Sequence, residues 1–202
     1  MAQAIKSPGL YLLILVACIF VMCAAFFQQI PAFAAHGALG ASAGAMAVSI
    51  IMVGGVVFKL VLGALNDKIG VKYTGIIAAS CGAIGILLAY IAGENVALFY
   101  AGMVVFGGGY AGLTVIAPML ARAAFGSLNY SQIYSWVSTG IFIATAVSFL
   151  VYGMIYDTTG SFDLCFILVI GMYVLAVVLV PITLAVSVSY THLRAHETLA
   201  NL

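Results

Sequence analysis

Few side chains in this sequence could bind a polar molecule, and Lys59 is the one charge that falls inside a long apolar run. Its ammonium can attract a carboxylate, and an ionisable group within a membrane span is a functional candidate by default. Lys59 precedes Leu65, near the end of the run, by about 9 Å of helix. A lysine at that depth can also extend to the membrane surface with its apolar stem in lipid. Two interpretations therefore stay open, a cation facing a cavity and a cation reaching the surface.

Gln28 and Gln29 are the second candidate for binding a polar molecule. Amides within an apolar run are costly in lipid unless they face protein or water. Successive helical residues point about 100° apart, so at most one of the two faces a cavity squarely. Hydrogen bonding between helices is the alternative role. Tyr110 and Thr114, in a glycine-rich run that suits either close packing or a bendable gate, are further candidates for lining a cavity.

The composition indicates a protein that lies mostly in lipid. Hydrophobic residues make up 66% of the chain and charged residues 5%, whereas soluble domains carry roughly a quarter charged residues. The net charge of +1 makes nucleic acid an unexpected partner. The four cysteines lie within apolar runs and form no C-x-x-C pair, so we expect buried thiols and neither a metal site nor a cofactor.

Six apolar runs are each long enough to cross a bilayer, which takes about 20 helical residues. They cover residues 9–35, 41–65, 73–92, 96–121, 131–156 and 164–186. Backbone groups in lipid must be hydrogen-bonded within the protein, so helices are expected rather than open sheets. The sequence therefore predicts an all-α membrane protein with six transmembrane helices in one unit, residues 1–186.

The loop charges predict the orientation of these helices. Basic residues lie before the first span and in the second and fourth loops: Lys6, Lys68, Lys72 and Arg122. The first, third and fifth loops contain no lysine or arginine. Because lysine and arginine concentrate on the cytoplasmic side, both termini are predicted to lie in the cytoplasm, with the helices in the cytoplasmic membrane.

Residues 187–202 differ in character from the rest of the chain. This polar tail contains two of the three histidines and no apolar span. We interpret it as non-native sequence, with a short polar terminus as the alternative, and assign it no function. A membrane-embedded serine protease needs a serine and a histidine within spans, so the remaining histidine, at a loop, argues against an enzyme.

The loop after the second run carries a motif with fixed spacing. Its specified positions are Gly63, Leu65, Asp67, Lys68, Gly70 and Lys72, in the pattern G-x-L-x-D-[RK]-x-G-x-[RK]. This pattern resembles the loop motif of the major facilitator superfamily. The first glycine would allow two helices to approach closely, and the second would permit a tight turn. The aspartate would face a helix N-terminus, and the resemblance implies that it latches one half of the transporter to the other.

The resemblance implies a fold of twelve helices in two six-helix halves, with the substrate between them. This chain would be one half, with membrane lipid, a small-molecule substrate and the missing N-terminal half as its partners. Residues 5–8 are similar to the linker that enters the second half. Residues 156–162 and Phe166 are similar to a loop of the monocarboxylate and oxalate/formate branch.

That branch carries a basic residue at the position of Lys59, where it faces the cavity and meets a substrate carboxylate. The resemblance therefore implies a secondary transporter of small organic anions, by symport or antiport. The chain departs from the branch because Gly55 stands where an aspartate is usual and the fifth span has no basic residue. A dicarboxylate between two cations is accordingly not favoured. The alternatives are a sugar or drug porter of the same fold, or a fragment inactive without its other half.

Overall fold

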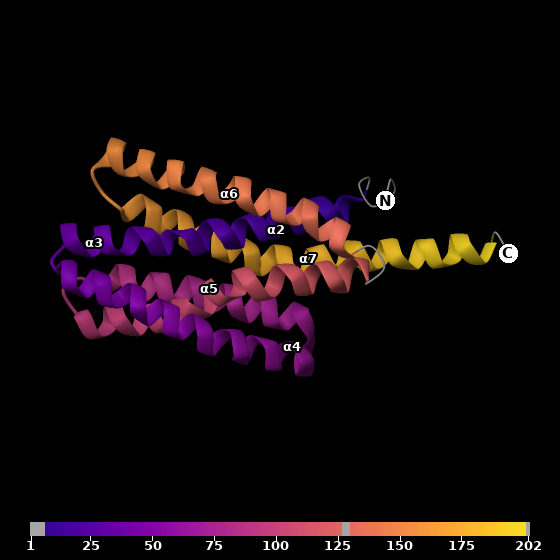
Figure 1. Cartoon of the computed structure of the whole chain (residues 1–202), viewed down its shortest axis with the longest axis horizontal. Helices are drawn as coiled ribbons and strands as arrows, with labels where there is room; N and C mark the ends of the chain where they lie inside the picture. Colours follow the sequence, from indigo (N-terminus) through magenta and orange to yellow (C-terminus); the bar gives the residue numbers. More distant parts are fainter. Residues whose placement is uncertain (1–6, 127–129, 201–202) are drawn as a thin grey trace.

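The computed structural model describes residues 7–126 and 130–200, with side chains to residue 187, and in these ranges the secondary structure is helical (Figure 1). The elements are α2 (Pro8–Ala25), the 3-10 helix η1 (Phe26–Gln29), α3 (Ile30–His36), α4 (Ala41–Ile91), α5 (Val96–Phe125), α6 (Tyr130–Thr159) and α7 (Asp163–Ala200). Lys6, one of the cations used to predict orientation, lies outside the described residues.

Within the described residues, five helical stretches are long and apolar enough to cross a membrane. They are Pro8–His36, Ala41–Ile91, Val96–Phe125, Tyr130–Thr159 and Asp163–Ser187. The sequence predicted six, and the difference lies in α4, which joins the second and third predicted spans. The other boundaries agree with the predicted ones to within four residues, except that α7 continues as a helix beyond residue 186.

Helix α4 reverses direction at Gly70. Its 51 residues would measure about 77 Å if straight, far more than the roughly 30 Å of a hydrocarbon core. Gly70 has φ 78° and ψ 165°, which is not helical. On one side of it Gly54 adjoins Gly107 of α5, and on the other side Gly82 adjoins Gly109 of the same helix. Both parts of α4 therefore lie along one stretch of α5, and Figure 1 shows the chain turning back.

The first span is interrupted by the 3-10 helix η1. Pro31 follows as the second residue of α3 and has no N–H with which to continue the α-helical ladder. A short tighter helix accommodates that break. Gln28 and Gln29 therefore lie at an irregularity and not, as the sequence predicted, in a continuous helix over residues 9–35.

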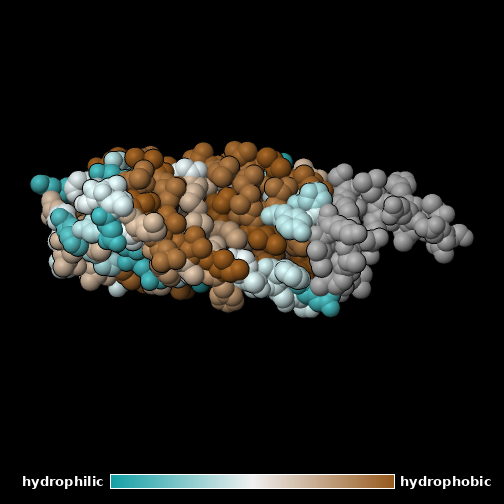
Figure 2. Space-filling model, turned by 90° about the horizontal axis from the view of Figure 1, so that it is seen from above, coloured by the Kyte–Doolittle hydropathy of each residue, from teal (hydrophilic) through white to brown (hydrophobic). Residues whose placement is uncertain are grey.

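The core is apolar, and so is much of the outer surface. Helix α2 packs between α5, α6 and α7, and the buried Tyr152 hydroxyl donates a hydrogen bond to the Met22 carbonyl, 2.7 Å away, which ties α6 to α2. Large hydrophobic side chains such as Leu60 and Phe142 are exposed. Figure 2 shows a broad hydrophobic surface over the middle of the molecule, with hydrophilic residues gathered mainly toward its ends. Lipid is the solvent that such a surface suits.

Candidate functional site

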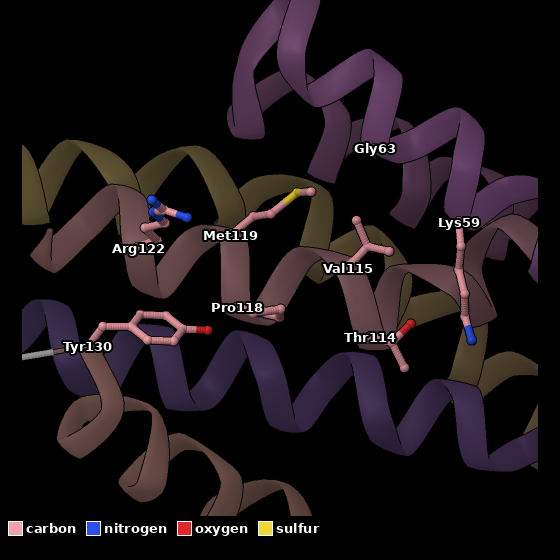
Figure 3. A pocket seen from close by; sticks show the side chains of 8 residues that line it. All are labelled: Lys59, Gly63, Thr114, Val115, Pro118, Met119, Arg122 and Tyr130. Carbon is pink, nitrogen blue, oxygen red and sulfur yellow. The ribbon is translucent and has the colours of Figure 1, made fainter. Parts of the chain in front are cut away.

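A pocket of about 470 Å³ lies between the first part of α4, the second half of α5 and the start of α6. Its lining residues are drawn in Figure 3: Lys59, Gly63, Thr114, Val115, Pro118, Met119, Arg122 and Tyr130. A cavity of this size can hold a small metabolite. The pocket contains the one cation that the sequence places inside an apolar run.

Helical spacing explains why these residues share the pocket. Lys59 and Gly63 are one turn apart on α4, and Thr114, Pro118 and Arg122 follow one another by single turns on α5. Residues four apart lie on the same helix face, so each helix presents one stripe to the pocket. Figure 3 shows Lys59 and Thr114 at one end of the pocket, with Arg122 and Tyr130 at the other.

The end of the pocket near Lys59 combines donors with acceptors. The Thr114 hydroxyl donates a hydrogen bond to the Ala111 carbonyl over 3.2 Å, so its lone pairs remain for another group. Pro118 has no N–H, so the Thr114 carbonyl lacks the helical donor that it would otherwise have. Lys59 brings three donors and a positive charge. A ligand with a carboxylate, with or without a hydroxyl, matches this set.

The structure gathers only some of the binding residues predicted from sequence. Lys59 and Thr114 line the pocket, whereas Tyr110, Gln28 and Gln29 are not among its lining residues. Tyr110 lies one turn before Thr114 and packs edge-on against Phe27, with ring centroids 5.4 Å apart. Gln28 is exposed on η1, and Gln29 is partly buried. The glutamines therefore belong to a different part of the surface.

The loop motif shows one agreement with its predicted geometry, and one prediction stays open. Gly70 adopts the positive φ expected of a glycine in a tight turn. At Gly63 no described residue makes the predicted close approach, because a Cβ would meet nothing within 4 Å among them, and a close approach there stays a prediction. This side of α4 faces the open pocket.

The other motif residues lie at or near the turn. Leu65 is partly buried and packs against the core. Asp67, Lys68 and Lys72 are exposed, and the Lys72 ammonium lies 5.5 Å from the Tyr73 ring centroid. This placement leaves the charges of the motif accessible. The predicted latching role of Asp67 would involve a second half of the transporter, and it stays a prediction.

Sequence reasoning missed two lining residues with polar side chains, Arg122 and Tyr130, and three apolar ones, Val115, Pro118 and Met119. The sequence places Arg122 in a loop, because the apolar run ends at residue 121. Helix α5 in fact continues to Phe125, so Arg122 lies on the helix, on the same face as Thr114. The i, i+4 spacing from Thr114 through Pro118 could have revealed it. No local signal marks Tyr130, whose position depends on where α6 crosses α5.

The described residues offer no evident metal site. Among them, no group of three or more histidine, cysteine, aspartate or glutamate side chains could hold an ion. The cysteines are free, and Cys23 and Cys165 are buried. The chemistry available in the pocket is thus that of amine, guanidinium, hydroxyl and carbonyl groups.

Comparison with known families gives one match. The model of the family described as Major Facilitator Superfamily matches residues 5–199, which is nearly the whole chain. No curated protein sequence matches. The family match accords with the helical structure, its membrane-length segments and its loop motif.

Proposed function

This chain belongs to the major facilitator superfamily, and we propose that it is one six-helix half of a secondary transporter that moves a small organic anion, such as a monocarboxylate, across the cytoplasmic membrane. Membership makes it a membrane transporter of the major facilitator kind. The organic anion, the six crossings and the place as the second half are our proposal.

The reversal at Gly70 supports six crossings. The parts of α4 on either side, residues 41–69 and 71–91, are each long enough to span a bilayer. With the other four candidate spans they make an even number, which returns the chain to the side on which it began. In this fold substrates bind near the middle of the membrane, between the two halves. A pocket that opens on the surface of one half suits that arrangement.

The position of Lys59 is the observation that carries the anion proposal. Its side chain is exposed in a membrane-length helix, yet it lines a pocket that also contains Thr114 and Arg122. Charges in a low-dielectric setting attract each other far more strongly than in water. A carboxylate entering the pocket would therefore meet a cation that apolar surroundings screen poorly. Alternating access would then expose the bound anion to each side in turn.

Replacing Lys59 tests this proposal. Lys59→Gln is expected to weaken binding of radiolabelled butyrate to the chain in lipid nanodiscs by roughly tenfold or more, since a charge-assisted hydrogen bond is lost. Lys59→Arg should retain part of the affinity, because the charge remains. Lys72→Gln is the matched control, because Lys72 is exposed on the same helix but does not line the pocket.

If Lys59→Gln bound butyrate as tightly as the unchanged chain does, the proposal would be contradicted. That result would mean that the amine only reaches toward the membrane surface. A neutral substrate near Gln28 or Gln29 would then be the better explanation, as in a sugar or drug porter.

The proposed orientation predicts a labelling pattern at the two ends of α6. Ser131 and Thr158 are exposed near opposite ends of this helix, so a cysteine at either should react in water. In a background without native cysteines, an impermeant maleimide applied to whole cells should label Thr158→Cys. Ser131→Cys should react only after permeabilisation, because its end of α6 adjoins the basic loops. Labelling of Ser131→Cys in intact cells would contradict cytoplasmic termini.

A further inference from the structure

Arg122 places a second cation in the pocket, at the end opposite Lys59. Figure 3 shows Lys59 beside Thr114, and Arg122 beyond Pro118 and Met119. The step from residue 114 to residue 122 advances a helix by about 12 Å. The two cations therefore do not surround one small anion, and they bracket an elongated space.

The surface between the cations is apolar. Val115, Pro118 and Met119 line this middle part, and none of their side chains has a hydrogen-bond donor. Gly63 adds open space, because a Cβ there would meet nothing within 4 Å among the described residues. A chain of methylene groups suits such a surface, since its burial is favourable and needs no polar partner.

The Arg122 end suits a carboxylate. A guanidinium presents a planar fork that pairs with both oxygens of a carboxylate. Arg122 is exposed in the last turn of α5, so its donors are accessible. Tyr130, at the start of α6, lies at the same end of the pocket, with its phenolic hydroxyl directed toward Pro118 (Figure 3).

We propose that the pocket binds a long-chain aliphatic dicarboxylate, with one carboxylate on Lys59, the other on Arg122 and the methylene chain across Val115, Pro118 and Met119. This inference rests on the proposed transport of organic anions and names the substrate class. It also changes what the sequence favoured, because the second cation comes from the end of the fourth predicted span and not from the fifth.

The length of the pocket selects among acids. The carboxylates of extended suberate are roughly 9 Å apart, taking about 1.2 Å of advance for each single bond. With the reach of two long side chains, suberate can contact both cations. Succinate is too short to contact both at once. Octanoate has the length of suberate but only one carboxylate.

The test measures binding of suberate, succinate and octanoate to the chain in nanodiscs by titration calorimetry. Suberate is expected to bind roughly tenfold more tightly than either other acid, as a second charge-assisted pair would give. Arg122→Gln should lower suberate affinity to the level of octanoate. Lys68→Gln, an exposed cation outside the pocket, should alter none of the three affinities.

A second variant tests the apolar middle of the pocket. Gly63→Leu places a side chain in the open space in the middle of the pocket. This variant should lower the affinity for suberate, while butyrate still binds at Lys59. Equal affinities for the three acids, or suberate binding that Arg122→Gln leaves intact, would overturn the dicarboxylate proposal. Arg122 would then serve only to offset the negative end of the α5 dipole. Failure of the organic-anion proposal itself would give a different result, because Lys59→Gln would then leave butyrate binding unchanged.

Discussion

Gly85→Ala is expected to cost about 3 kcal/mol or more of unfolding free energy, at the upper end of what overpacking typically costs. An ideal Cβ at Gly85 would lie 2.6 Å from the Phe106 Cα and 2.7 Å from the Gly102 carbonyl oxygen, and it would also overlap the Phe106 nitrogen. All three atoms belong to the backbone of α5. No side chain can rotate to make room, so the helices themselves would have to separate.

Gly171→Ala is the matched control. Gly171 is an exposed glycine within α7, and a Cβ there would meet nothing within 4 Å among the described residues. Alanine is favoured over glycine in a helix by roughly 1 kcal/mol, a gain that both variants share. The difference between the unfolding free energies of the two variants therefore reports the packing of α4 against α5 alone. Unfolding in SDS, followed by circular dichroism, gives both free energies, and equal values would contradict the close contact of α4 with α5.

The glycines of α5 serve close packing in this structure. The sequence left open whether the glycine-rich run packs or bends. Gly107 and Gly109 adjoin the backbone of α4 at Gly54 and Gly82, one on each side of the reversal. Small residues at such contacts let helix backbones approach in lipid. Helix α5 is therefore held by both parts of α4, and it carries the pocket stripe that begins at Thr114.

The membrane-length helices were predictable because each apolar run has the length that a bilayer requires. The predicted span 96–121, for example, lies within the observed Val96–Phe125. The extra turn of α5 was not predictable from hydropathy, because it crosses a charge at Arg122. That turn makes Arg122 a pocket residue, so an error of four residues at a helix end concealed the second cation of the candidate site.

The glutamines illustrate a different limit of the sequence. Their predicted geometry assumed a regular helix, in which neighbours point about 100° apart. In the structure they end the 3-10 helix η1, which has three residues per turn and so places neighbours about 120° apart. Pro31 was a visible local signal of this irregularity. By contrast, the position of Tyr130 beside α5 depends on tertiary packing that no short sequence pattern encodes.

Gly70→Ala is expected to destabilise the chain by on the order of 1–3 kcal/mol, because φ 78° with ψ 165° lies in a region that is essentially restricted to glycine. The variant would favour continuation of the α4 helix through the turn. A straight α4 of 51 residues cannot lie within one bilayer crossing, so correct insertion should fall as well. Unfolding in SDS and the yield of monodisperse protein in detergent measure the two effects.

Gly63→Ala is the comparison within the same motif, and it is expected to be neutral or slightly stabilising in this chain. Gly63 is helical and its side faces open space, so alanine brings only its higher helix propensity. Equal damage from both variants would contradict the open face that the structure gives Gly63. If Gly63→Ala instead impairs transport only when the chain is joined to the proposed N-terminal half, this face of α4 is where that half approaches. The two glycines of the motif would then have separate roles, Gly70 in the turn within this chain and Gly63 in contact between halves.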